Sequence, residues 1–327
     1  MPEPRFAPPR WLANPHVQSL LAGSPPRRAW IAHRARDLLA ASRELILDCG
    51  HGVRLQGFHA GGAPDRHELV VLLHGWEGSA DAQYVLSAAS YLHSRGYAVF
   101  RLNFRDHGET HHLNPELFHS CRIAEVVGAV QAVQRRWPAH ALSLVGYSLG
   151  GNFALRVAAH APDAGLALTR VVAICPVLDP AHTLAAIEAA PRIYRDYFVL
   201  KWRRSLRKKH RAWPDRYRLE ELLASRDLSG MTERLVLEHA GFPDLASYLN
   251  GYAIVGDVLA GLCVPSRIIT ALDDPIIPRA DLARLAPSAA LSIDAQAHGG
   301  HCGFLETLGG PTWADREVLA TLSGARG

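Results

Sequence analysis

Ser148 is the centre of a Gly-Tyr-Ser-Leu-Gly sequence, a spacing that can present a serine hydroxyl as a nucleophile. An apolar run at 141–145 precedes it and a helical pattern at 149–160 follows it, so the pattern predicts a tight strand–turn–helix connection. The flanking glycines relieve steric crowding in such a turn. The start of a helix leaves backbone N–H groups free, so the N–H of Leu149 is predicted to donate to a developing oxyanion. The alternative is a glycine-rich turn with a solvent-exposed serine.

A nucleophilic serine needs a histidine base and a carboxylate that orients the base, and the later sequence offers two candidates for each. Asp273 and Asp274 follow an apolar run at 267–271, which places them at the carboxyl end of a predicted strand. His298 and His301 lie in a glycine-containing loop after the next apolar run. The order Ser, Asp, His is that of a triad built on a parallel sheet. Spacing alone does not separate the two acids or the two histidines, and the acids could instead only cap a turn.

A second oxyanion donor is predicted in the loop that follows the apolar run 69–73. This loop reads His-Gly-Trp-Glu-Gly-Ser from His74 to Ser79. A histidine–glycine step lets the backbone turn, which would aim the N–H of Trp76 at the same oxyanion as the N–H of Leu149. Alone, the loop could be an ordinary glycine-rich turn, so its interpretation depends on Ser148.

The elements that would position these residues alternate between short apolar runs and helical stretches from about residue 43 onward. Strands are predicted at 43–48, 53–59, 69–73, 98–103, 141–145, 169–174, 267–271 and 290–293, and helices at 81–95, 123–136, 149–160 and after Pro311. This alternation is typical of an α/β fold with a mostly parallel twisted sheet flanked by helices. The alternation of strands and helices ends at Pro176, and a helical, aromatic and basic segment follows as far as Cys263.

Three parts are therefore expected. Residues 1–40 are rich in Pro, Arg and Trp without a clear period and are predicted to form an irregular N-terminal arm. Residues 41–175 and 264–327 are predicted to form the core, and residues 176–263 a helical lid inserted into it. A chain of 327 residues, 48% of them hydrophobic, is long enough for one large α/β domain with such an insertion.

Four segments resemble the α/β-hydrolase superfamily, and within it the YheT-like branch of bacterial esterases and related eukaryotic hydrolase-domain lipases. They are residues 14–20 (Asn-Pro-His-Val-Gln-Ser-Leu), 74–78, 146–150 and 299–304. The resemblance implies an α/β-hydrolase fold and the hydrolysis of carboxylic esters, such as fatty acyl or glycerolipid esters. It favours Asp274 as the acid, because it stands before a Pro-apolar-apolar-Pro run, and His301 as the base, because it lies in Gly-Gly-His-x-Gly-Phe. Residues 14–20 are expected to fix the arm near the lid.

At one position the chain departs from many of these relatives. They have Arg-Gly-x-Gly after a strand, whereas this chain has Arg-Asp-His-Gly, so that Asp106 replaces a glycine. In the fold that the resemblance implies, this loop borders the acyl-binding side. The substrates of those relatives therefore do not carry over directly.

The segment from Arg192 to Arg218 is densely basic, and its apolar residues at 198, 202 and 206 share one helical face. The favoured interpretation is a lid helix that packs this face inward and leaves its charges in solvent. The alternative is an amphipathic helix that makes a weak contact with an anionic membrane surface.

No cofactor and no metal are expected. The histidines at 107, 111, 112 and 119 have no HExxH pattern and no carboxylate at a matching spacing, so they are interpreted as solvated loop histidines. No nucleotide-binding glycine motif is present. The five cysteines are scattered and odd in number, which favours buried free thiols over a disulfide framework.

The composition favours a soluble cytoplasmic protein, and the family resemblance implies a small-molecule or lipid ester as its substrate. The net charge of only +4 gives no reason to expect a nucleic-acid partner. The sequence shows no signal peptide and no run of about 18 apolar residues that could span a membrane. An acyltransferase or a thioesterase could use the same triad. A catalytically silent binding protein is the alternative from another class, and the presence of all three triad residues in order argues against it.

Overall fold

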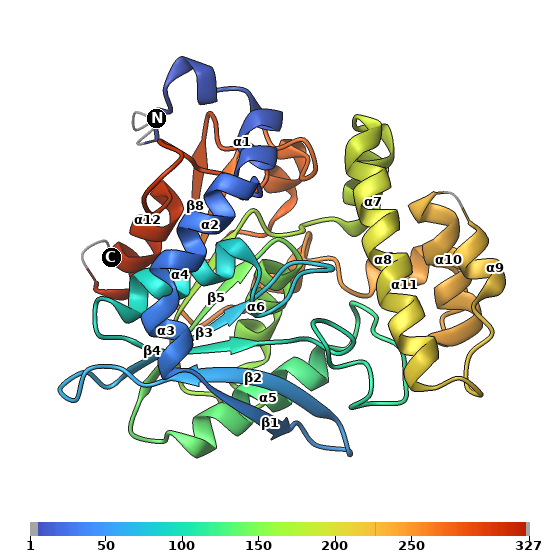
Figure 1. Ribbon diagram of the computed structural model, residues 1–327, viewed down its shortest axis with the longest axis horizontal. Coiled ribbons are helices and arrows are strands. Elements are labelled where there is room, and N and C mark those ends of the chain that lie inside the picture. Colours follow the sequence, from blue (N-terminus) through green and yellow to red (C-terminus); the bar gives the residue numbers. More distant parts are fainter. Residues whose placement is uncertain (1–5, 226, 325–327) are drawn as a thin grey trace.

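The chain folds around one eight-stranded sheet, in a computed structural model that describes residues 6–225 and 227–324 (Figure 1). The strands are β1 (Arg43–Asp48), β2 (Arg54–Ala60), β3 (Glu68–Leu73), β4 (Ala98–Leu102), β5 (Ala141–Tyr147), β6 (Leu168–Ile174), β7 (Ser266–Ala271) and β8 (Leu291–Gln296). Their order is β1-β2-β4-β3-β5-β6-β7-β8, with β2 antiparallel to both neighbours and all other pairs parallel. The predicted fold class and all eight predicted strands are confirmed.

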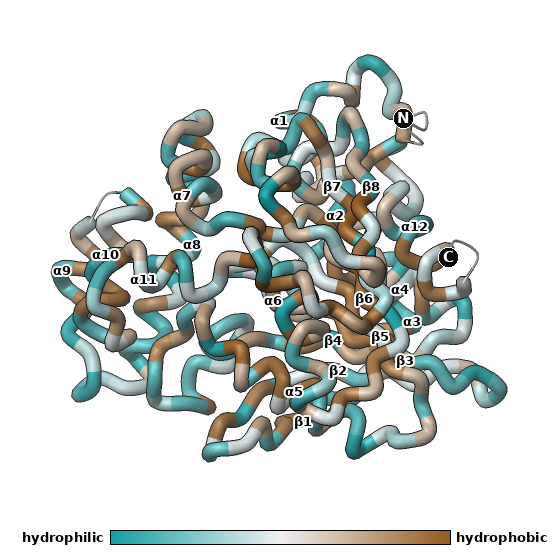
Figure 2. The backbone as a smooth tube through the Cα atoms, turned by 180° about the vertical axis from the view of Figure 1, so that it is seen from behind, coloured by the Kyte–Doolittle hydropathy of each residue, from teal (hydrophilic) through white to brown (hydrophobic). Residues whose placement is uncertain are grey.

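Helices cover both faces of the sheet, which explains why its strands are continuous apolar runs. On one face lie α2 (Pro25–Arg34), α3 (Arg36–Ala41), α4 (Gln83–His93) and α12 (Trp313–Leu322), and on the other lie α5 (Ile123–Arg136) and α6 (Leu149–His160). Residues of β3 alternate between two hydrophobic clusters: Leu69 and Val71 pack on one side, and Val70 and Leu72 on the other. Figure 2 shows the hydrophobic colours gathered on the central strands near β5 and β6.

The parallel strands β3, β5, β7 and β8 all end at the same edge of the sheet. The loops after them are therefore neighbours, although they are far apart in the sequence. Ser148 follows β5, Asp274 follows β7 and His301 follows β8. The sheet thus explains why Ser148 and His301, which are 153 positions apart in the sequence, meet at one place.

The N-terminal arm is helical, so the prediction of an irregular arm is wrong. It contains the short helix η1 (Arg10–Leu12), α1 (Pro15–Leu21) and α2, and α3 follows directly. The Asn14 side chain caps α1 by accepting hydrogen bonds from the N–H groups of His16 and Val17. The prolines at the first positions of α1 and α2 start these helices, because that position needs no N–H donor. Such short helices give little periodicity to detect.

Among the described residues, five α-helices lie between β6 and β7, as the predicted helical insertion requires: α7 (Pro180–Ala189), α8 (Arg192–Ala212), α9 (Glu220–Ala224), α10 (Leu228–His239) and α11 (Leu245–Asn250). They stand together beside the sheet in Figure 1. Asp179, Asp227 and Asp244 cap the first turns of α7, α10 and α11 with their carboxylates. No helix in the described part of the chain is long and apolar enough to cross a membrane.

Candidate active site

Ser148 occupies a strained turn between β5 and α6. Its backbone has φ 53° and ψ −118°, a left-handed conformation that costs free energy in a residue with a Cβ atom. Larger residues would clash at both flanking glycines. A Cβ on Gly146 would lie 2.1 Å from the carbonyl oxygen of Gly150, and a Cβ on Gly150 would lie 2.3 Å from the carbonyl oxygen of Leu73. The predicted strand–turn–helix connection is therefore present, and it leaves Ser148 half-buried at the edge of the sheet.

Ser148, His301 and Asp274 form one chain of hydrogen bonds. The Ser148 Oγ lies 3.0 Å from Nε2 of His301, and Nδ1 of His301 lies 2.9 Å from Oδ2 of Asp274. The other carboxylate oxygen of Asp274 accepts from the N–H groups of Ile276 and Ile277 at 2.8 and 3.1 Å. Because Asp274 is fully buried and fixed in this way, it can hold Nδ1 protonated and leave Nε2 to accept the proton of Ser148.

Asp273 and His298 occupy a different place. Asp273 accepts a hydrogen bond from the N–H of Gly300 at 2.9 Å, and its other oxygen lies 3.4 Å from Nδ1 of the partly exposed His298. This pair braces the loop that carries His301. Between the candidates that spacing left open, the geometry therefore favours Asp274 and His301 for contact with Ser148.

The loop after β3 lies directly against the nucleophile. A Cβ on Gly75 would be only 3.3 Å from the Cβ of Ser148. The backbone N–H groups of Trp76 and Leu149 donate no hydrogen bond to any residue that the structure describes. Both N–H groups therefore remain available for an oxyanion formed at Ser148.

The arm holds the His301 loop, a role that sequence reasoning missed. The Ser19 Oγ accepts a hydrogen bond from the N–H of His301 at 2.9 Å. The buried side chain of Gln18 donates to the carbonyl of Leu305 at 2.9 Å and accepts from its N–H at 2.7 Å. A Cβ on Gly300 would lie 2.3 Å from the carbonyl oxygen of Pro15, so the loop fits closely against α1. Two of the segments that carry the family resemblance, 14–20 and 299–304, are thus partners in space.

The same helix also touches the lid, as expected. Nδ1 of His16 lies 3.0 Å from the hydroxyl of Tyr194 in α8. No local signal could have revealed the contact with the His301 loop, because Gln18 and Leu305 are separated by 287 residues.

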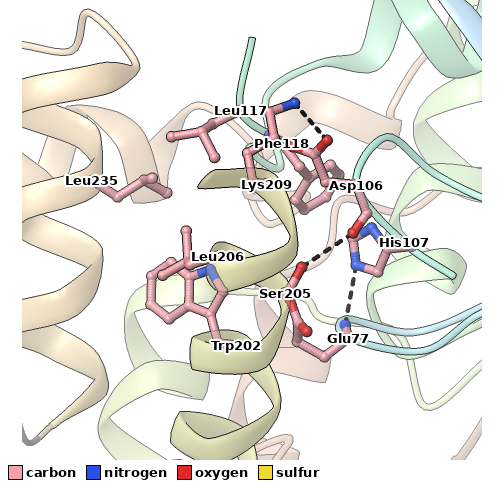
Figure 3. A pocket seen from close by; sticks show the side chains of 10 residues that line it. All are labelled: Glu77, Asp106, His107, Leu117, Phe118, Trp202, Ser205, Leu206, Lys209 and Leu235. Carbon is pink, nitrogen blue, oxygen red and sulfur yellow. Dashed lines mark hydrogen bonds and ion pairs between the residues drawn. The ribbon is translucent and has the colours of Figure 1, made fainter. Parts of the chain in front are cut away.

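A buried ion pair ties α8 to the core. Lys209 and Asp106 are both labelled in Figure 3. Nζ of Lys209 lies 2.6 Å from Oδ1 of Asp106 and donates to the carbonyls of Asn114 and Glu116, each at 2.8 Å. The other oxygen of Asp106 accepts from the N–H of Phe118 at 2.9 Å. Burial raises the pKa of Asp106 to about 6 and lowers that of Lys209. Lys209 is fully buried, so the prediction that this helix leaves all its charges in solvent is wrong at this residue.

The same contact explains the replacement of a glycine by Asp106. The residue has φ 58°, a conformation that glycine adopts freely and aspartate tolerates better than most residues. Its carboxylate then supplies the partner that Lys209 requires.

The inward face of α8 packs on the loop that carries Trp76. The Trp76 ring lies 5.4 Å from that of Phe198 and 5.2 Å from that of Trp202, and Nζ of Lys201 donates to the carbonyl of Glu77 at 2.7 Å. Trp202 and Leu206 are buried and Phe198 is half-buried. The predicted inward face at 198, 202 and 206 is confirmed, and it lies on the proposed oxyanion loop.

Two of the four loop histidines are buried, so their interpretation as solvated is wrong. His107 lies 2.7 Å from the carbonyl of Arg105 through Nδ1 and accepts from the N–H of Glu77 through Nε2 at 3.1 Å. His111 lies 2.9 Å from the hydroxyl of Ser205 in α8. Burial lowers the pKa of His107 to about 4 and that of His111 to about 3, so both act as neutral hydrogen-bonding groups. His112 is exposed, as predicted, whereas His119 is partly buried and burial lowers its pKa to about 3.

Two groups of possible metal ligands occur among the described residues: Cys175 with His301 and Cys302, and Asp179 with His182 and Asp281. In the first group both nitrogens of His301 are engaged by Ser148 and Asp274. In the second the guanidinium of Arg284 already binds both carboxylates. All five cysteines are free thiols; Cys49 and Cys175 are buried as expected, whereas Cys263 is exposed.

Ser148 and His301 open into a cavity of about 780 Å³. The arm contributes Leu20 and Ile31 to its wall, and the lid contributes most of the aliphatic and aromatic side chains. Those from the lid include Leu184, Ile187, Phe198, Trp202, Leu235 and Tyr252. The cavity is thus a largely apolar chamber that Ser148 and His301 enter, and Arg28, Asp81, Gln83 and Lys201 also line it.

The Lys209–Asp106 pair leads to a stability prediction. Lys209→Met should lower the free energy of unfolding by about 3–5 kcal/mol, because it leaves the Asp106 carboxylate buried and unpaired. Denaturant unfolding followed by circular dichroism measures this effect. Lys208→Met is the matched control, since Lys208 pairs with the exposed Glu109, and it should cost less than about 1 kcal/mol.

A second variant separates loss of the charge pair from loss of packing. Adding Asp106→Asn to Lys209→Met should recover part of the lost stability, because asparagine keeps an acceptor for Phe118 and removes the buried charge. Equal midpoints for Lys209→Met and Lys208→Met would contradict the buried ion pair.

The chain is similar to a known protein family, to named sequences and to solved structures. The sequence profile of the alpha/beta hydrolase fold family matches residues 68–307. The chain is 24% identical to the "Putative esterase YheT" of Escherichia coli, over 92% of this chain and 87% of that one. It is 26% identical to the human "Protein ABHD15", over 94% of this chain and 66% of that one. The solved structure of the Pyrococcus furiosus esterase Pf2001 superposes with a TM-score of 0.60 at 15% identity, covering 88% of this chain and 94% of the other.

Proposed function

The chain belongs to the α/β-hydrolase family, and from that premise we propose that it is a serine hydrolase that cleaves carboxylic esters through an acyl-enzyme on Ser148. The observation that carries the proposal is the continuous hydrogen-bonded chain from Ser148 through His301 to Asp274. The word esterase in the names of the bacterial relative and of the archaeal structure supports the same class of reaction.

The first half of the reaction forms the acyl-enzyme. Nε2 of His301 takes the proton of Ser148 as Oγ attacks the ester carbonyl, and the carbonyl π electrons move to oxygen. The N–H groups of Trp76 and Leu149 stabilise this oxyanion. His301 then gives its proton to the departing alcohol as the carbon–oxygen bond breaks and the carbonyl re-forms. Asp274 stabilises the imidazolium throughout.

The second half returns the enzyme to its starting state. His301 takes a proton from water while the water oxygen attacks the acyl carbonyl, and the same two N–H groups hold the second oxyanion. The proton then passes to Oγ of Ser148 as the acid departs. The cycle is balanced without a cofactor.

The cavity supports an ester with an apolar acyl group. Its walls are mainly aliphatic and aromatic, and its volume of about 780 Å³ lies at the upper part of the range of small-molecule sites. We therefore propose fatty acyl esters, glycerolipid esters among them, as the substrate class.

Hydrolysis of p-nitrophenyl esters from acetyl to palmitoyl tests this function. We expect turnover with an optimum above acetyl, because short chains leave most of the apolar wall unused. Parallel assays with acyl thioesters and with added alcohol acceptors identify a thioesterase or an acyltransferase. Absence of turnover on every acyl donor would overturn the proposal in favour of a binding protein.

The protonation of His301 predicts the pH dependence of the reaction. Burial disfavours the imidazolium, but the Asp274 carboxylate favours it more, and the net effect raises the pKa of His301 to about 9. A protonated His301 cannot accept the proton of Ser148, so kcat/KM should rise with pH and level off only near pH 9. A profile that levels off below pH 6.5 would show that Asp274 does not stabilise the imidazolium.

The hydroxyl of Ser19 predicts a positioning role in the arm. Ser19→Ala removes the acceptor for the N–H of His301, so kcat should fall about tenfold with little change in KM, because the base is misplaced rather than the substrate. Ser19→Thr keeps the hydroxyl and should restore kcat. Ser24→Ala is the matched control, since the Ser24 side chain does not cap α2. A change confined to KM would assign Ser19 to substrate contact instead.

A further inference from the structure

The helix α8 presents a second face, which points to solvent. Ile193, Tyr197 and Leu200 are exposed by 56%, 53% and 48%. They are followed by the exposed residues Arg204, Arg207 and Arg211. The spacing of four, three, four, three and four residues places all six on one side of the helix. The outward stripe, as we call these six residues, is apolar in its first half and basic in its second.

The apolar half of the outward stripe lies at the opening of the cavity. Ile193 and Tyr197 are exposed to solvent and also belong to the cavity wall. Leu20 of α1, itself 47% exposed, belongs to the same wall from the arm side. The opening that leads to Ser148 therefore has large apolar side chains on both sides, a combination that marks interaction sites.

The charged side chains that α8 contributes near this opening are mainly basic, and the exposed Asp81 on the cavity wall is paired with Arg101. Arg192 is exposed beside Ile193, and Asp196, the acidic residue within this part of α8, pairs with Arg195. The end of α7 adds exposed uncharged residues, Ala185 and Ala189. The surface thus offers apolar groups next to guanidinium groups, which is the arrangement that binds a layer of acyl chains beneath anionic headgroups.

We propose that the outward stripe, with Leu20, docks this protein onto an anionic lipid surface so that the cavity opening faces the acyl layer. The occupant is a lipid surface and not a protein, because a protein seated on this rim would cover the way to Ser148. A lipid layer leaves the path to Ser148 open and can itself supply an apolar ester. The supply of an ester substrate rests on the proposed function, whereas the docking does not.

Vesicle binding tests the docking without any measurement of activity. Full-length protein is sedimented with vesicles of phosphatidylcholine alone and of phosphatidylcholine mixed with phosphatidylglycerol. We expect binding to the mixed vesicles, weakened by salt. The triple variant Arg204→Glu, Arg207→Glu and Arg211→Glu should bind them about 100-fold more weakly, since each arginine near an anionic surface contributes roughly a factor of five. Leu200→Ser should weaken binding through the apolar half.

A triple variant with the same change of charge is the matched control. Arg43→Glu, Arg135→Glu and Arg136→Glu alter exposed arginines of β1 and α5, which lie at the end of the molecule away from α1 and α7 in Figure 1. This variant should keep most of the binding. Both triple variants should hydrolyse a soluble acetyl ester like the unmodified protein, because none of the six arginines lines the cavity or contacts the triad.

Three outcomes would overturn the docking. They are no sedimentation with the mixed vesicles, equal binding to neutral and mixed vesicles, or an equal loss in the two triple variants. Failure of the hydrolase proposal gives a different result: the protein would still bind vesicles but would not hydrolyse soluble esters.

Discussion

Replacing Ser148 by alanine should lower kcat for ester hydrolysis by about three orders of magnitude or more, with a much smaller change in KM. The variant keeps both proposed oxyanion donors but removes the hydroxyl oxygen that lies 3.0 Å from Nε2 of His301. Some rate above that in water should remain, because the oxyanion donors and substrate binding do not need the hydroxyl. Steady-state kinetics on the best ester of the chain-length series measures the effect.

The fold should tolerate this change. Ser148 has a left-handed backbone conformation, so alanine keeps the same strain and the variant should unfold at a similar denaturant concentration. Ser143→Ala in β5 is a suitable control, since it removes a hydroxyl from the strand that leads to Ser148, and it should retain activity. A loss of less than about tenfold in kcat for Ser148→Ala would contradict the assignment of the nucleophile.

Asp274→Asn should produce the second-largest loss, about 10³–10⁴-fold in kcat/KM. An amide can present an N–H to Nδ1 of His301, which would favour the tautomer that carries its proton on Nε2 and cannot accept one from Ser148. The pH dependence of the residual activity should also move to lower pH, because the carboxylate that raises the pKa of His301 is gone.

Asp273→Asn is the matched control, one residue away and with the same chemical change. Asp273 contacts the N–H of Gly300 and His298 rather than His301, so this variant should lose less than about tenfold. A larger loss for Asp273→Asn than for Asp274→Asn would exchange the roles of the two acids.

The strands of the sheet and the positions of the proposed reacting residues at its edge could be predicted because their signals are local. Each buried strand is an apolar run, and the crowded turn around Ser148 forces glycine at 146 and 150. Asp274 and His301 follow strands whose parallel order brings their ends together. The two acids are adjacent in the sequence and the two histidines are three positions apart, so spacing cannot choose between them. The hydrogen bonds in the structure favour Asp274 and His301.

The features that escaped prediction depend on contacts between distant segments. Lys209 looks like one more surface charge until α8 is placed on the loop that carries Asp106. The helices of the arm are too short for a clear period, and the role of Ser19 appears only when the His301 loop is packed against α1. His107 and His111 are polar residues whose burial depends on α8 covering their loop.

The most direct test of the central claim is covalent labelling of Ser148 in the native protein. Purified protein is treated with a fluorophosphonate, digested and analysed by mass spectrometry, beside the Ser148→Ala variant. We predict one modified residue, Ser148, and no labelling of the variant, because only a serine activated by His301 attacks phosphorus at a useful rate. A protein that stays unlabelled, or that is labelled equally in the Ser148→Ala variant, would contradict a nucleophilic Ser148 and with it the proposed hydrolase.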